Sequence, residues 1–255
     1  MTRNISMMRI LIGIDDTDNL DSPGSGTAAE NLARALQHNG LAQCEGITRH
    51  QLLVHADIPF TSHNSSMCIP ATCEAGKVDD VISFGRSFLE NSSAEGSDPG
   101  LCVVIDGSRL DKGALISFGR NAKQNVLDKQ AAYDLANALG VHLSEHGGTG
   151  GGVIGALAAT GLRICGNDGR YRGWHHFGSA GEASTVAELC NHDCVDAVRT
   201  DAGEVLGPDE MVVFAEDTVK TVLLGNTRVI PVAKATAGQP GPRWTTLTKK
   251  EMKRF

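Results

Sequence analysis

The sequence predicts an α+β protein with a ferredoxin-like βαββαβ unit, an additional α/β segment carrying a glycine-rich loop, and a small C-terminal β appendage. Three observations lead to this prediction. Short apolar runs alternate with amphipathic helical patterns over the first 110 residues. Five of the six residues at 147–152 are glycine, and a run of small apolar residues follows them. Beyond residue 180, short strand-like runs alternate with turns.

The first part of the chain supplies the βαββαβ pattern. The strands are short and apolar, the helices repeat apolar residues every three or four positions, and glycine or polar loops separate them. In chain order the predicted elements are a strand at 9–14, a helix at 27–38, strands at 51–56 and 66–71, a helix at 75–89 and a strand at 101–105.

The rest of the chain divides into a helical continuation and a β-rich end. Helical patterns cover 113–127 and 129–139, and the glycine run feeds a further helix. Asn167-Asp168-Gly169 is a strong hairpin turn signal, so we expect strands at 162–165 and 170–177 on either side of it. Strands are also expected at 211–214, 219–224 and 227–232, with a mobile linker at 238–242 and a mobile basic tail to residue 255. The expected divisions are 1–110, 111–180 and 181–255.

Composition limits the partners of the chain. The 255 residues carry a formal net charge of −7 and 11 aromatic side chains, which disfavours a nucleic-acid-binding surface spread over the whole chain. RNA binding through a local basic patch stays possible but is not favoured by the charge. The apolar run near the start is too short to span a bilayer and has no signal-peptide pattern, so we expect a cytoplasmic protein without a membrane partner.

An aspartate cluster closes the first predicted strand. Asp15, Asp16 and Asp18 fall within four residues around Thr17. Like charges so close together need a cation, solvent or amide donors, and Mg²⁺ favours one or two carboxylates together with phosphate oxygens. The cluster therefore indicates a metal–nucleotide site, with the three aspartates as metal ligands and Thr17 beside the nucleotide. The alternative is an acidic turn whose side chains cap the backbone.

Two loops that open helices are candidate phosphate sites. Backbone N–H groups and the positive end of a helix dipole favour phosphate at such places. The alternatives are an ordinary serine or threonine cap for the first loop and a flexible hinge for the second. The candidate residues are Gly24, Ser25, Gly26 and Thr27 in the first loop and Gly148, Thr149, Gly150, Gly151 and Gly152 in the second.

A basic and aromatic group follows the Asn-Asp-Gly turn. Such side chains are those that stack on a nucleobase and neutralise phosphates. An exposed hairpin with cross-strand aromatic pairs explains them nearly as well. The residues are Arg170, Tyr171, Arg172, Trp174, His175, His176 and Phe177.

Four segments together resemble the archaeal tRNA-Ile agmatinylcytidine synthetase family. They occur in the family's order and span about residues 10–162. They are Ile12-Gly13-Ile14-Asp15-Asp16-Thr17-Asp18 with Gly24-Ser25-Gly26-Thr27, Ile58-Pro59-Phe60 with Asn64, Asp98-Pro99-Gly100, and Gly152-Val153-Ile154-Gly155-Ala156-Leu157-Ala158-Ala159.

The resemblance implies ATP and Mg²⁺ as cofactors and activation of a cytidine carbonyl. It implies that Asp15, Asp16 and Asp18 serve metal and phosphate chemistry and that Thr27 stands where the family carries a phosphorylated threonine. In the same scheme Asn64 orients the nucleotide or the acceptor. Several basic family residues are replaced here, and the C-terminal part is shorter than the family's nucleic-acid-binding domain with its zinc ribbon. The replacements fall at Thr61, Ser62, His63, Gly148, Thr149 and Gly151.

The combined prediction is an ATP- and magnesium-dependent transferase or ligase. It would activate a carbonyl or hydroxyl of a small-molecule or nucleoside-like substrate by phosphoryl transfer, with Asp15, Asp16 and Thr27 as catalytic residues. One alternative is a tRNA-modifying enzyme acting on cytidine with a separate RNA-binding partner. The other is a regulatory module that binds a nucleotide or metabolite without turnover.

Overall fold

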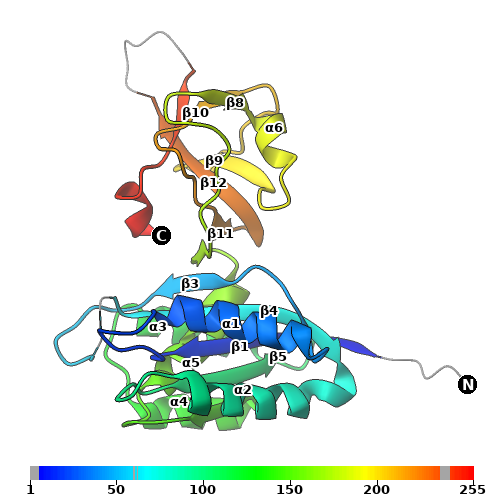
Figure 1. Cartoon of the computed structure of the whole chain (residues 1–255), viewed down its shortest axis with the longest axis vertical. Coiled ribbons are helices and arrows are strands. Elements are labelled where there is room, and N and C mark those ends of the chain that lie inside the picture. The colour runs from blue at the N-terminus through cyan, green and yellow to red at the C-terminus, as the bar shows by residue number, and fades with distance from the viewer. Residues whose placement is uncertain (1–5, 60, 62, 236–241) are drawn as a thin grey trace, which may run out of the picture. The chain divides into compact units, whose positions relative to one another are not determined.

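The computed structural model describes residues 6–59, 61, 63–235 and 242–255, and the chain forms two compact units, Met1–Cys165 and Gly166–Phe255 (Figure 1). The helical segment after residue 110 thus belongs to the same unit as the first strands. No helix within the described ranges is long and apolar enough to cross a bilayer. Each unit is described separately below.

The first unit is built on an antiparallel sheet in the order β6-β5-β1-β4-β3, with β2 also on β4. The central strand β1 places Ile12 opposite Ile69 of β4 and Val103 of β5. The fold is therefore mixed α/β with a mostly antiparallel sheet, as predicted. The strands are β1 (Met7–Asp15), β2 (Gln43–Cys44), β3 (Thr48–Gln51), β4 (Ser65–Glu74), β5 (Gly100–Ile105) and β6 (His142–Glu145).

Helices cover both faces of this sheet. On one face Ile10, Ile12 and Ile14 of β1 pack in a core with α1 (Ser25–His38) and α2 (Val78–Ser92), which follows the turn η1 (Ala75–Lys77). On the other face Leu11 packs in a second core with α3 (Lys112–Ala122), α4 (Lys129–Leu139) and α5 (Gly152–Cys165). The period-two alternation of β1 therefore serves two apolar cores, which explains why the strand is apolar at nearly every position.

Helix α5 lies unusually close to its neighbours because its contact positions are glycine. A Cβ atom on Gly13 of β1 would lie 2.0 Å from the carbonyl oxygen of Ala156. A Cβ on Gly161 would lie 2.0 Å from the carbonyl oxygen of Leu115 in α3. The small-residue run of α5 is thus a packing requirement, and it holds the start of the helix against the end of β1.

Two predicted strands of this region are corrected. The chain leaves the sheet after Gln51, because the backbone N–H of Leu53 donates to the carbonyl of Ala122 in α3 instead of to a strand. Residues 162–165 form the last turn of α5, where Gly161 permits continued packing on α3, and are not a strand. The predicted helix at 113–127 ends at Ala122, and β6 was not predicted from the sequence.

The second unit is a small mixed sheet in the order β7-β11-β12-β13-β10-β8, with β9 parallel to β12. The three predicted strands at 211–232 are present, whereas the strand predicted at 170–177 is reduced to two residues. The elements are β7 (Arg170–Tyr171), β8 (Ala183–Thr185), α6 (Val186–Cys190), β9 (Ala197–Thr200), β10 (Met211–Val213), β11 (Val222–Leu224), β12 (Thr227–Lys234), β13 (Trp244–Thr246) and η2 (Glu251–Arg254).

The C-terminal tail is part of this unit's core, which corrects the prediction of a mobile tail. Leu247 and Met252 are 5% and 2% exposed and pack with Val222 and Val229. The tail has few apolar residues and they lie among lysines, so the sequence pattern did not predict that they are buried. The linker predicted at 238–242 lies, except for Pro242, outside the described residues.

Candidate functional site

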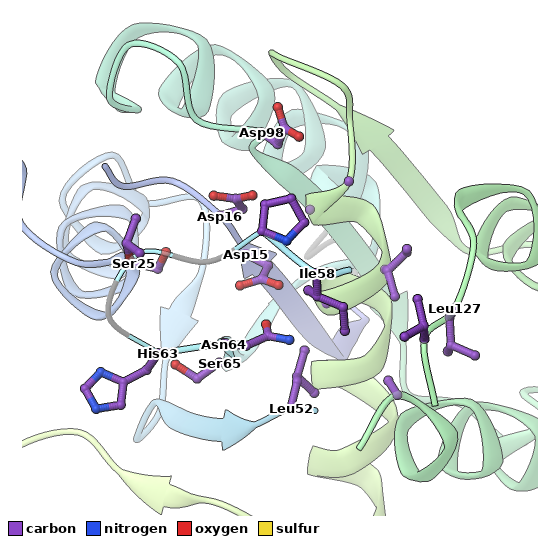
Figure 2. Close-up of a pocket in the computed structure, with 18 of the residues that line it drawn as sticks. Asp15, Asp16, Ser25, Leu52, Ile58, His63, Asn64, Ser65, Asp98 and Leu127 are labelled. Carbon is purple, nitrogen blue, oxygen red and sulfur yellow. The ribbon is translucent and has the colours of Figure 1, made fainter. Parts of the chain in front are cut away.

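A pocket opens where β1 ends, between the 52–65 segment, the start of α5 and the segment that follows α3 (Figure 2). One part of its lining is acidic and the other is apolar. The acidic residues are Asp15, Asp16, Asp18, Asp57 and Asp98. The apolar residues are Leu52, Ile58, Pro59, Ala122, Val126, Leu127 and Ile154. None of the described lining residues is lysine or arginine, so an anionic ligand must bring its own counterions.

Asp15 is the last residue of β1 and lies against α5. Its carboxylate faces Gly155 so closely that a Cβ there would lie 1.7 Å from Oδ2. Burial, together with the nearby charge of Asp16, raises the pKa of Asp15 to about 8. A carboxyl group with such a raised pKa loses its proton more readily when a cation or another positive charge lies close to it.

Asp16 has φ of +51°, a left-handed backbone conformation that few non-glycine residues adopt. Strained backbone of this kind is frequent at functional sites. Burial raises the pKa of Asp16 to about 6, and the charges of Asp98 and Asp18 add to the effect. Figure 2 shows Asp15, Asp16 and Asp98 in succession along one side of the pocket.

Asp18 is used to hold the loop before α1. Its Oδ1 accepts hydrogen bonds from Ser25 N at 2.9 Å and Ser25 Oγ at 2.6 Å, and its Oδ2 accepts from Thr61 Oγ1 at 2.8 Å. Thr17 donates to Ser25 Oγ from both its backbone N–H and its hydroxyl. Asp18 therefore caps α1 from a distance, which satisfies an otherwise free N–H at the helix start.

The three-aspartate metal site stays a prediction. In the described part of the chain, no three His, Cys, Asp or Glu side chains are placed to hold a metal ion together. Both oxygens of Asp18 accept hydrogen bonds from Ser25 or Thr61, so Asp15 and Asp16 are the aspartates of the cluster that line the pocket without capping α1.

The glycine loop is tied to Asp98. Thr149 N donates to Asp98 Oδ1 at 2.6 Å, and the Thr149 hydroxyl donates to Oδ2. The Asp98 carbonyl accepts from Gly152 N at 3.1 Å, at the start of α5. Gly148 and Gly150 have φ of +53° and +76°, which explains why glycine is needed in this turn. The Asp98 carboxylate thus accepts hydrogen bonds from the glycine loop, whose donor groups are of the kind that bind phosphate.

Asn64 anchors the rim of the pocket opposite the loop. Its Nδ2 donates to the carbonyl of Leu53 at 2.6 Å, and its own carbonyl accepts from Leu52 N at 2.9 Å. Figure 2 shows its side chain and that of Asp15 reaching the same space. One of its two amide N–H groups is used in this bond, and Asn64 can offer its Oδ1 acceptor to a ligand.

The structure brings together only part of the predicted site. Among the described residues that line the pocket are Asp15, Asp16, Asp18, Ser25, Asn64, Thr149, Gly151 and Gly152. The described lining does not include Thr17, Gly24, Gly26, Thr27, Gly148 or Gly150. Thr17 is buried beneath the loop and Thr27 lies within the first turn of α1, so Ser25 is the hydroxyl of the 24–27 loop that lines the pocket.

Asp98 and the apolar residues Ala122, Val126 and Leu127 were not identified as site residues from the sequence. Asp98 lies 80 residues from the aspartate cluster, and its only signal was the Asp-Pro-Gly motif before a strand. Val126 could have been recognised as an apolar residue within a polar turn, and its side chain is 46% exposed.

The fold and the site thus define a mixed α/β domain with an acidic pocket next to a glycine loop. No protein-family model and no curated protein matches the chain. Among solved structures, the chain is similar to TiaS in its complex with an isoleucine tRNA and ATP, with 25% identity and a TM-score of 0.52. It is equally similar to a tRNA fluorescent labeling enzyme, with 25% identity and a TM-score of 0.52.

Each of these two matches covers 60% of this chain and 36% of the other chain, so this chain spans about a third of the length of the proteins it matches. Apo TiaS, described as a tRNA agmatidine synthetase, has a TM-score of 0.50 at 22% identity, which shows a shared fold. The family resemblance of the sequence motifs is therefore confirmed for part of the chain.

Proposed function

We propose that this protein is an ATP- and Mg²⁺-dependent enzyme that activates a carbonyl or hydroxyl oxygen of a small-molecule or nucleoside-like acceptor by phosphoryl transfer. The observation that carries the proposal is the pairing, in one pocket, of two aspartates of raised pKa with a glycine loop at a helix N-terminus. The ATP complex of the similar TiaS structure supports nucleotide binding. The order β5-β1-β4-β3 supports a ferredoxin-like unit beneath this site.

Mg²⁺ fits the donors that are present. Asp15 and Asp16 would hold it, because Mg²⁺ takes one or two carboxylates and completes its shell with water and phosphate oxygens. Crowded carboxylates of raised pKa gain most from a nearby cation. When bound, the ion would neutralise charge on the phosphates, which the lining itself does not do.

The chain's own residues would bind the nucleobase, the phosphates and the acceptor. Val126, Leu127 and Ile154 form an apolar wall for a nucleobase, and the amides of the glycine loop face the phosphates. Binding requires Asp98 to release Thr149, so that phosphate oxygens replace the Asp98 carboxylate at those donors. Asn64 Oδ1 would orient the acceptor. Catalysis would rest on positioning and charge neutralisation.

A second candidate is modification of a tRNA cytidine. The observation that favours it is that both solved structures at 25% identity are enzymes of tRNA. The two candidates share the ATP chemistry and differ in the acceptor, so comparing nucleosides, small hydroxyl compounds and tRNA as acceptors distinguishes them.

The proposal is tested by ATP consumption in the presence of Mg²⁺. Asp15→Asn and Asp16→Asn should each lower turnover by at least about 100-fold, because each removes a charge needed next to the phosphates. Asp80→Asn, an exposed aspartate of α2, is the matched control and should retain activity. ATP binding without release of ADP or AMP under any acceptor would instead favour the regulatory module.

The hydroxyl candidates are separated by two further variants. Thr27 is proposed as a phosphate contact or transient phosphoacceptor, while Ser25 is the hydroxyl of the same loop that lines the pocket. Loss of a covalently bound phosphate in Thr27→Ala, with retention in Ser25→Ala, would support the role of Thr27. The reverse result would transfer the role to Ser25.

A further inference from the structure

An exposed tryptophan with two lysines over its ring lies in the second unit. Trp174 is 43% exposed, and Lys220 Nζ and Lys249 Nζ lie 4.5 Å and 5.3 Å from its ring centroid. We call these three residues the Trp174 cluster. They come from three segments of the chain, so only the folded unit brings them together.

The backbone around Trp174 is held in place. Gly173 adopts φ of +97°, and its carbonyl accepts a hydrogen bond from Lys220 Nζ at 2.8 Å. The next residue, His175, exchanges backbone hydrogen bonds with Val219 at 2.9 Å and 2.8 Å. The indole is therefore presented on a fixed turn, which lowers the entropy lost when a ligand stacks on it.

Burial distinguishes Trp174 from the other aromatic residues of the unit. Tyr171, Phe214 and Trp244 are 5%, 2% and 3% exposed and serve the core. Trp174 is the one aromatic residue among the exposed large apolar side chains in the described ranges. A single exposed apolar side chain needs no explanation, but a fixed indole flanked by two ammonium groups suits a ligand that is both planar and anionic.

The second unit carries less net negative charge than the first unit, so a polyanion is more favourably bound to the second unit. Residues 166–255 contain eleven Lys and Arg against twelve Asp and Glu, whereas residues 1–165 contain twelve against eighteen. Two acidic neighbours of Lys249 are engaged by backbone donors: Glu216 accepts from Lys249 N at 3.2 Å, and Glu251 accepts from Thr248 N at 2.9 Å. Their carboxylates are thereby held at the backbone.

We propose that the Trp174 cluster binds single-stranded nucleic acid, with an unpaired base stacked on Trp174 and the adjacent phosphates neutralised by Lys220 and Lys249. Stacking on an aromatic ring accepts any base. A base that stacks on Trp174 takes the place of a lysine ammonium group over the ring, and that lysine then pairs with a phosphate next to the base. A duplex does not offer an unstacked base, and an acidic peptide leaves the indole without a stacking partner. The cluster shares no residue with the ATP pocket and binds independently of nucleotide turnover.

The test measures binding of a fluorescently labelled 12-nucleotide single-stranded RNA to the full chain by anisotropy, without ATP. Trp174→Ala should weaken binding about tenfold, and Trp174→Phe, which keeps an aromatic face, by no more than about threefold. Lys249→Met should weaken binding about threefold and make the salt dependence less steep by about one phosphate contact. Lys234→Met, which removes the same charge from an exposed residue at the end of β12, is the matched control and should bind as the wild type does.

Several results would overturn the proposal. Unchanged affinity of Trp174→Ala would show that the indole is not the stacking surface. Equal affinity for a duplex of the same sequence, or full competition by a polyglutamate peptide, would show a purely electrostatic surface. Thermal unfolding of each variant ensures that a loss of binding is not a loss of folding. Asp15→Asn should bind the RNA normally, so this test and the ATP test fail independently.

Discussion

Replacing Gly155 by alanine is the most direct test of the contact that shapes the pocket. In the interior of α5 this change should favour the helix by about 0.8–1 kcal/mol. The new Cβ, however, would lie 1.7 Å from Oδ2, 2.5 Å from Cγ and 3.0 Å from Cβ of Asp15. Ordinary contact begins near 3.4 Å, so the carboxylate must retreat by about 1.7 Å.

Because all three crowded atoms belong to one side chain, the fold can survive while the site is lost. A displacement of about 1 Å can lower turnover about 100-fold, which corresponds to about 2.7 kcal/mol of transition-state stabilisation. We therefore expect Gly155→Ala to lower Mg²⁺-dependent ATP turnover about 100-fold, while its free energy of unfolding in urea changes by less than about 2 kcal/mol.

Two control variants make the interpretation specific. Gly76→Ala meets no atom within 4 Å and should leave turnover and stability unchanged. Gly13→Ala meets a backbone carbonyl at 2.0 Å, so it should instead destabilise the first unit, by about 3 kcal/mol. Wild-type turnover in a folded Gly155→Ala protein would refute the conclusion that Asp15 acts from its place against α5.

Three further predictions concern other contacts. Asp98→Asn should retain the hydrogen bond from Thr149 N but remove one like charge, so Mg²⁺-free ATP should bind about fivefold more tightly in calorimetry; weaker binding would contradict this. Burial, with the charge of Arg86, lowers the pKa of His142 below 6.5. The unfolded chain then binds more protons below pH 6.5, so stability falls on acidification from pH 7 to 5, and His142→Gln should flatten that fall in urea titrations at each pH. Met252→Ala should destabilise the second unit by about 2–4 kcal/mol, measured by thermal unfolding, because its side chain is 2% exposed; no change would mean that the tail is not part of the core.

Local pattern was enough to predict much of the fold. The alternation of β1, the helical periodicity of α1 and α4, and the turn-separated strands β10 to β12 lie where the sequence places them. Errors arose where a neighbour in space decides the structure. Residues 162–165 precede a hairpin turn signal and were therefore predicted as a strand, yet Gly161 lets α5 continue against α3. Leu53 leaves the sheet because its N–H finds a partner on α3.

The same distinction holds for the site. The sequence predicts Asp15 and Asp16, since three aspartates at the end of a strand need compensation whatever surrounds them. It could not separate Asp18 from them, because its role depends on Ser25 and on Thr61, which lies 43 residues away. Asp98 could be placed only by the pairing of β5 with β1, which brings the segment before β5 next to the end of β1.

By itself, the sequence determined where an acidic cluster and a glycine loop lie in the chain, because local spacing and small side chains are properties of neighbouring residues. Only the tertiary structure decided that these two segments meet, that Asp98 binds the glycine loop while Asp18 caps α1, and that a basic tail contributes Met252 to a core. The physical reason is that hydrogen bonding and burial depend on which residues, far apart in the chain, pack together. The local sequence around each residue does not specify these partners.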